Sequence, residues 1–168
     1  MVGVTTTVPS STSWYPGVDA NSWGAFEYTP LTTTQHEQFH NGVAINCQQS
    51  GYTIPSYAVA MVAVDRVNGK IHFGIDGLWW TSTSTRGAFN GFTPSTDFSN
   101  LPTTGALYPA LGALYNSNIS FAGVVNFGQD HTFAGTKSPL TSPYSDDDGN
   151  GEFYYQPPTG FKALATSY

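Results

Sequence analysis

Residues 57–80 read YAVAMVAVDRVNGKIHFGIDGLWW, and they carry the clearest secondary-structure signal in the chain. It opens with a nearly continuous apolar run over 57–65, which has the length of a strand buried on both faces. Asn68-Gly69 and Asp76-Gly77 follow, and both dipeptides tolerate the positive φ angles that type I′ hairpin turns require. The two turns bracket the alternating segment 70–75, so the stretch predicts a three-stranded antiparallel meander that ends in Leu78-Trp79-Trp80.

Shorter segments with β character lie on both sides of the meander. We expect strands at 23–28 and 43–47, an antiparallel pair made by 105–115 and 119–127, and closing strands at 152–155 and 161–165. Stretches rich in Thr, Ser and Pro are expected to be surface loops, at 5–16, 29–34, 81–104 and 136–149. Because no repeat or domain boundary is visible, residues 1–168 are expected to form one domain.

The composition agrees with an all-β chain and argues against several functions. Charged residues make up 10% of the chain, against about 25% in typical proteins. The net charge is −6 and the five Lys and Arg are scattered, so we expect no binding to nucleic acid or to an anionic membrane. The single cysteine, Cys47, excludes a disulfide within the chain. No apolar run approaches the roughly 18 residues of a membrane helix, and the N-terminus lacks the features of a signal peptide.

The meander and the segments around it resemble a SPRY domain of the type found in bacteriophage structural proteins. The segments that carry the resemblance follow one another along the chain, at 15–24, 40–42, 62–79, 108–110, 125–129 and 146–164. The resemblance covers about residues 2–165 and implies an antiparallel two-sheet β-sandwich of the concanavalin-like jelly-roll type. It also implies recognition of partners through loops at one end, on a tail fibre, a spike or a capsid decoration.

The chain departs from the family because it lacks the strands that normally precede the segment that Val2-Gly3-Val4 resembles. A sandwich without its first strands exposes an unpaired edge, so we expect an oligomer or a partner chain to complete the sheet by strand addition. With no export signal, the expected protein is a non-enzymatic virion component assembled in the host cytoplasm. Its expected partners are other virion subunits, a host surface protein or a glycan.

Residues 36–40 spell H-E-x-x-H. On a helix this pattern presents two zinc-binding histidines and a glutamate that acts as the general base. With His36, Glu37 and His40 in these roles, the chain would be a zinc metallopeptidase, which is the alternative from another class of function. The context does not favour a helix, because 31–34 is a weakly helical run and Asn41-Gly42 follows at once. We therefore expect a polar loop or strand and no enzyme, and helicity of 31–42 is the deciding observation.

The acidic run DDDGNG at 146–151 matches the start of a calcium loop, with Asp146, Asp148 and Asn150 as the oxygen ligands. The twelfth position of such a loop is Pro157, where a bidentate glutamate is required. Calcium is therefore a weak candidate, and no other cofactor is expected. The competing interpretation is a solvated acidic turn.

Aromatic residues in the expected loops are the better binding candidates. They are Trp14 and Tyr15 before the first clear strand, Phe98 with the nearby Arg86, and Tyr144 in the loop at 136–149. Such side chains supply large contact areas and stack on sugar rings, so a carbohydrate-binding module is the alternative within binding. The competing interpretation for each is a packing role. No Gly-x-Ser-x-Gly motif or clear pair of carboxylates indicates a catalytic site. Among the carboxylates, Asp65 is expected to fix the Asn68-Gly69 turn.

Overall fold

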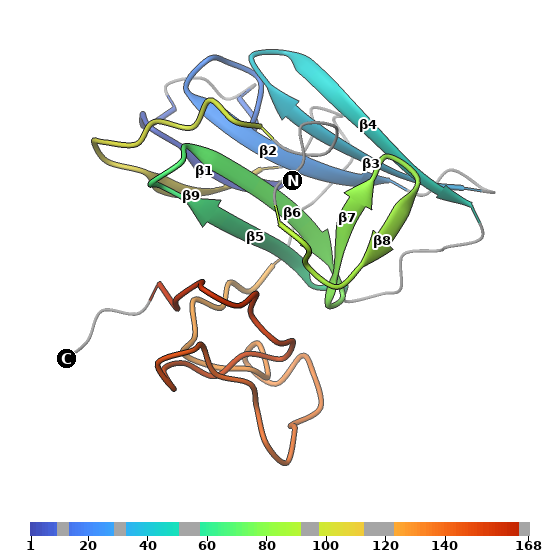
Figure 1. The fold of residues 1–168 in the computed structure, drawn as a ribbon, viewed down its shortest axis with the longest axis vertical. Coiled ribbons are helices and arrows are strands. Elements are labelled where there is room, and N and C mark those ends of the chain that lie inside the picture. The colour runs from blue at the N-terminus through green and yellow to red at the C-terminus, as the bar shows by residue number, and fades with distance from the viewer. Residues whose placement is uncertain (10–13, 29–32, 51–57, 92–97, 113–122, 165–168) are drawn as a thin grey trace. The chain divides into compact units, whose positions relative to one another are not determined.

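The computed structural model describes residues 1–9, 14–28, 33–50, 58–91, 98–112 and 123–164. The chain forms two compact units, Met1–Phe121 and Ala122–Tyr168, which we call the first unit and the second unit. None of the described residues is helical, and all nine strands among them belong to the first unit (Figure 1). The described part of the chain accordingly offers no helix that could cross a membrane.

The first unit consists of two antiparallel sheets, which confirms the expected two-sheet β-sandwich (Figure 1). The five-stranded sheet has the order β4-β3-β2-β1-β9 and contains β1 (Val2–Thr5), β2 (Ser22–Tyr28), β3 (Thr33–His40), β4 (Val43–Ser50) and β9 (Tyr108–Leu111). The four-stranded sheet has the order β5-β6-β7-β8 and contains β5 (Ala60–Asp65), β6 (Lys70–Ile75), β7 (Leu78–Ser82) and β8 (Thr85–Gly87). Because β1 lies between β2 and β9, the sheet edges are β4, β9, β5 and β8.

The predicted meander is present as β5, β6 and β7. β5 pairs with β6 along its whole length, and the last two residues of β6 pair with β7. Asp76 and Gly77 both have positive φ, 48° and 82°, as a type I′ turn requires. At Asn68-Gly69 only Gly69 has positive φ (64°), so the prediction of a type I′ turn is wrong there. The connection is the longer segment 66–69, in which one left-handed glycine is sufficient.

The prediction that 57–65 forms a strand buried on both faces is also wrong. β5 is an edge strand, and Ala63 is its one buried residue. The strand buried on both faces is β6, where every residue from Ile71 to Ile75 is buried. On one face of β6, Ile71 and Phe73 join the core. On the other face, His72 stacks on Trp79 with 5.5 Å between ring centroids.

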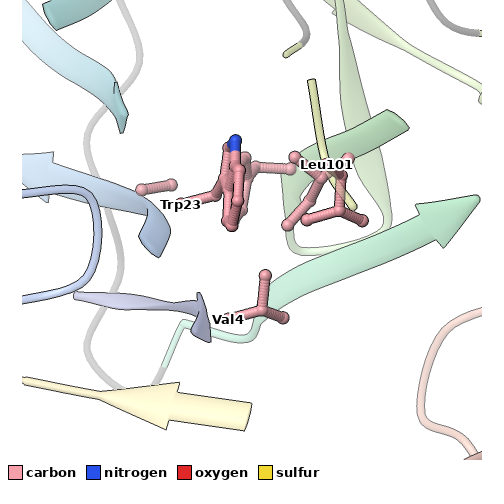
Figure 2. Packing of buried hydrophobic residues seen from close by; sticks show 6 residues of the cluster. Val4, Trp23 and Leu101 are labelled. Atoms are coloured by element: carbon pink, nitrogen blue, oxygen red, sulfur yellow. The ribbon is translucent and has the colours of Figure 1, made fainter. Parts of the chain in front are cut away.

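The core lies between the two sheets and is drawn in Figure 2. Val4 and Trp23 project from the five-stranded sheet, and Leu101 comes from the segment that leads to β9. The buried cluster contains Val4, Trp23, Ala25, Ile71, Phe73 and Leu101. The indole of Trp23 also stacks on the imidazole of His40, with 4.5 Å between centroids and 6° between planes.

The expectation of an uninterrupted surface loop at 81–104 is wrong in three places. β8 interrupts it, and Leu101 is only 3% exposed within the core. Phe98 forms a bridge with Ile71, and the amide of Ile71 donates to the Phe98 carbonyl at 3.1 Å. Burial of these apolar side chains by the two sheets outweighs the loop-like composition of the segment around them.

The late strands also differ from the prediction. Within 105–115 only Tyr108–Leu111 is a described strand, and it pairs with β1. Residues 123–127 form no strand, and 113–122 lie outside the described residues. At 152–155 only Phe153 forms a bridge, with Tyr144, and 161–164 form no strand, while Ala165 lies outside the described residues.

The second unit is held together by side chains that bond to its backbone. The Asn126 Oδ1 accepts the amide hydrogens of Gly128 and Asp130, at 2.7 and 3.1 Å. The Asp130 carboxylate in turn accepts the amide of Thr132 at 2.8 Å and that of Ala134 at 2.7 Å. Asn and Asp side chains compete with strand ladders in this way, which explains why the late strands are replaced by turns.

His131 in the second unit is a structural residue. The amide of Leu140 donates to its Nε2 at 3.2 Å, so Nε2 acts as the acceptor. The proton then resides on Nδ1, which lies 3.0 Å from the Glu152 Oε2. Both ring nitrogens are thus occupied by partners within the unit.

Candidate functional site

Loops from both sheets gather at one end of the sandwich, which we call the loop end and define by residues 17–21, 41–42, 66–69 and 98–107 (Figure 1). On the side of the five-stranded sheet, the amide of Asn41 donates to the Asp19 carbonyl at 3.1 Å. The amide of Gly42 donates to the Gly17 carbonyl at the same distance. These bonds fix the β3–β4 turn against the loop that precedes β2.

The four-stranded sheet is tied to the same end. The amide of Leu101 donates to the Gly69 carbonyl at 2.8 Å, and the Arg66 Nη2 donates to the Gly105 carbonyl at 3.0 Å. The Trp23 Nε1 donates to the Asn100 Oδ1 at 2.8 Å, which connects the segment 98–107 to the opposite sheet. The loop end is therefore held in one arrangement by both sheets.

Asp19 organises the first of these loops. Its Oδ1 accepts the Ser22 hydroxyl at 2.8 Å and the Asn21 amide at 3.0 Å, and its Oδ2 accepts the Trp14 Nε1 at 3.0 Å. Partial burial raises the pKa of Asp19, but the hydrogen bonds, led by that from Ser22, hold the pKa below its ordinary value of 3.8. Asp19 is thus ionised at neutral pH and serves to shape the loop.

Asp65 has the same role at the β5–β6 connection, which confirms the prediction that it fixes this turn. Its Oδ1 accepts the amides of Val67 and Asn68, both at 3.0 Å, and its Oδ2 accepts the Asn68 Nδ2 at 2.7 Å. The bond from the Asn68 side chain is the largest cause of a lowered pKa at Asp65. The turn presents Val67 at its tip, where the side chain is 86% exposed.

Exposed apolar residues surround the loop end and were missed by the sequence analysis. Val67 is joined by Val43, which follows the β3–β4 turn and is 63% exposed, and by Tyr108 at the start of β9, which is 46% exposed. The available signal was an apolar residue at Val67, between Arg66 and Asn68, where a hairpin tip is normally polar.

Trp14 and Tyr15 lead into the loop end along the outer face of the five-stranded sheet. Pro16 is fully buried there, and a Cβ on Gly24 would overlap its carbonyl oxygen. The Tyr15 ring meets the edge of Phe39, with 6.3 Å between centroids and 80° between planes. Both aromatic candidates are half-buried and take part in packing, so binding by them stays a prediction.

The other three binding candidates belong to different elements of the chain. Phe98 is at the loop end, but its ring packs on the core and lies 5.7 Å from that of His40. Arg86 is on β8 and 9% exposed, and its guanidinium lies 5.4 Å from the centre of the Trp80 ring. Tyr144 belongs to the second unit and is 44% exposed. The structure thus assigns packing contacts to Phe98 and Arg86 and leaves Tyr144 open to solvent.

The H-E-x-x-H motif lies in β3, so the helix that the zinc-peptidase alternative requires is not formed. The Cα atoms of positions four residues apart on a strand are about 13 Å apart, whereas on a helix such positions are neighbours on one face, as the motif requires. His40 is also engaged, because its Nδ1 lies 3.0 Å from the Ser22 carbonyl oxygen and its ring stacks on Trp23. Among the described residues, no three His, Cys, Asp or Glu side chains gather in a way that could hold a metal ion.

The proposed calcium ligands form a closed turn in the second unit. The Asp146 Oδ1 accepts the amides of Asn150 and Asp148, at 2.8 and 3.0 Å, and its Oδ2 accepts the amide of Ala163 at 2.9 Å. Asp148 forms an ion pair with Lys162. Calcium binding stays a prediction, and it requires an ion to displace these donors.

Acid is expected to open this turn. The amide of Ala163, followed by that of Asn150, lowers the pKa of Asp146 below its ordinary value of 3.8. A carboxylate with a lowered folded pKa stabilises the fold fully above its unfolded pKa, and this stability is lost as the pH falls through the folded value. We therefore expect exchange of the Asn150 and Ala163 amide hydrogens, followed by NMR, to accelerate below about pH 4 relative to their intrinsic rates.

Asp146→Asn should remove most of this acid dependence and accelerate exchange of the same amides already at pH 6. The control is Asp147→Asn, because Asp147 accepts one backbone amide, that of Gly160, where Asp146 accepts three. The control should keep the acid transition. Equal behaviour of the two variants would contradict the central role of Asp146.

Compared with known proteins, the chain matches no family model, no curated sequence and no solved structure. Its class is therefore defined by its own geometry. It is an antiparallel two-sheet β-sandwich with a hydrogen-bonded loop end, followed by a second compact unit built from turns.

Proposed function

We propose that this chain is a non-enzymatic structural and binding module of a bacteriophage particle, in a tail fibre, spike or capsid decoration. In this proposal the loop end recognises a neighbouring subunit or a ligand on the host surface. The observation that carries the proposal is the loop end itself, which both sheets hold in place and which exposes 86% of Val67. The assignment to a virion rests on the resemblance of the sequence to phage SPRY domains.

Preorganisation supports a role in recognition. Loops that are fixed before a partner arrives lose little conformational entropy on binding, so more of the contact energy appears as affinity. The carboxylates of Asp19 and Asp65 are directed at loop amides and hydroxyls, which suits a scaffold better than acid–base chemistry. A glycan is the second candidate ligand, because the exposed ring of Tyr108 lies beside this end.

The test uses two probes for the two kinds of partner. Native mass spectrometry of the purified protein detects copies of itself, co-purifying chains and bound metal, and an array of bacterial surface glycans detects a host ligand. Val67→Glu should weaken binding to a co-purifying partner chain or to a glycan at least about tenfold, because a charge would be buried in the contact. Leu78→Glu is the control, since Leu78 is also exposed (42%) but lies outside the loop end.

Both variants should retain the wild-type unfolding temperature, since both side chains are on turns or strand ends. The proposal would be overturned by a monomer that carries one zinc ion. It would also be overturned by a protein that shows no partner in native mass spectrometry and no binding on the glycan array. If Val67→Glu and Leu78→Glu weakened binding equally, the loop end would not be the binding site.

A further inference from the structure

We propose that β4 pairs with β4 of a second copy, so that the two five-stranded sheets join into one continuous antiparallel sheet. The inference goes beyond the proposed function, because it assigns a contact between two copies of the chain to a strand edge and not to the loop end. β4 forms the edge of the five-stranded sheet, beyond β3, and is drawn at that edge in Figure 1.

The register of the β3–β4 hairpin determines which backbone groups β4 presents outward. Asn41 and Gly42 have φ of 52° and 70°, so the hairpin has a two-residue type I′ turn. The residues flanking such a turn, His40 and Val43, form a hydrogen-bonded pair, and the pattern alternates from there. Ala44 and Asn46 therefore direct their N–H and C=O groups away from β3, toward the open edge.

The sequence of β4 lacks the residue types that normally protect a sheet edge. Its sequence, VAINCQQS, contains no proline and no charged residue over eight positions. Val43 is 63% exposed, and Ala44 and Asn46 are exposed as well. A long, uncharged and exposed edge strand is a template for pairing with another strand.

The three other sheet edges are protected. β9 contains Pro109, which has no amide hydrogen to donate. β8 has three residues, and its pairing with β7 is interrupted by a register shift. β5 exposes only Ala60 fully among its six residues, and it ends in the charged Asp65. β4 is thus the edge best suited to strand addition.

The composition of β4 favours a second copy as the partner. Antiparallel pairing about a two-fold axis brings a strand against itself, so the strand has to be compatible with its own sequence. Each copy carries a net charge of −6, and two copies repel each other over most of their surfaces. The uncharged β4 allows two copies to meet without like charges opposite each other in the new ladder.

The first experiment measures dimerisation of the full chain by sedimentation and native mass spectrometry. The wild-type protein should be a dimer, and Asn46→Pro should raise the dissociation constant at least about tenfold, because two symmetry-related hydrogen bonds are lost. Asn46→Ala is the matched control, since it removes the side chain and keeps the outward amide. It should remain a dimer.

A second variant keeps the test decisive if the proline disturbs the strand. Ala44→Lys should raise the dissociation constant about tenfold, because it places a like charge of each copy beside the new ladder. Leu111→Lys at the opposite edge of the same sheet is its control and should leave the dimer intact. Both lysines make the chain less negative, so a general charge effect would strengthen association in both.

Amide exchange locates the contact. The amides of Ala44 and Asn46 should exchange at least about tenfold more slowly in the wild-type dimer than in Ala44→Lys. A monomeric wild-type protein overturns the inference, and a positive glycan array would then still support the proposed function. A wild-type dimer that Ala44→Lys leaves unchanged overturns the β4 joint alone. If Ala44→Lys abolishes the dimer and the glycan array is negative, the β4 joint is supported and recognition of a host glycan is contradicted.

Discussion

Trp23→Ala is expected to lower the free energy of unfolding of the first unit by about 3–5 kcal/mol. The side chain is 2% exposed and lies in the cluster that joins the two sheets (Figure 2). Its removal leaves a cavity beside Ile71 and Phe73 and ends the stacking contact with His40. Urea denaturation, followed by fluorescence of the remaining tryptophans, measures the loss.

Trp23→Phe distinguishes the contribution of the buried ring from that of its hydrogen bond. It keeps most of the buried apolar area and loses the hydrogen bond to Asn100, so a loss of about 1–2 kcal/mol is expected. Trp14→Ala is a control for a tryptophan that is only half-buried and should cost less than Trp23→Ala. If Trp14→Ala and Trp23→Ala had equal effects, Trp23 would not be the centre of the core.

Gly24→Ala is expected to destabilise the first unit by about 3 kcal/mol, although it adds a single methyl group. A Cβ at this position would overlap the carbonyl oxygen and the Cβ of Pro16. The backbone around Pro16 would have to move away from the sheet. This movement would also strain the hydrogen bond from the amide of Gly17 to the Ser22 hydroxyl. Urea denaturation measures the stability, and the change in Trp14 fluorescence reports the displaced segment.

The matched substitution is Gly87→Ala, also at a strand glycine. A Cβ there would meet only the Thr81 Cγ2, at 3.7 Å, which is ordinary van der Waals contact. The expected change in the free energy of unfolding is therefore within about 0.5 kcal/mol. A similar loss in both variants would show that glycine flexibility, and not the approach of Pro16, explains the effect at Gly24.

The candidate site was predictable only in part. Asp65 was assigned correctly to its turn, because an aspartate three residues before Asn68 can reach the amides of that turn. Phe98 and Arg86 were chosen as loop residues, yet the sheets bury them against the core and against Trp80. Val67 was not chosen, since its exposure depends on how Asp65 holds the turn around it.

The β class, the central meander and most of the strands of the first unit could be predicted from the amino-acid sequence. Alternation of side chains, Asn-Gly and Asp-Gly turns and the scarcity of charged helix formers act over a few residues, so they can be read locally. The same local signals placed residues 31–42 in a loop or strand, and β3 (Thr33–His40) confirms the strand.

Which strands lie at the sheet edges and which lie in the interior could not be predicted, because this depends on the tertiary fold. The apolar run of β5 looks like an interior strand, but the sheet order places β6 there and leaves β5 at an edge. In the same way, β9 pairs with β1, which is more than 100 residues away in the chain. Such pairings depend on contacts between distant segments, whose gain in burial has to exceed the entropy of closing the chain between them, and no local pattern records that balance.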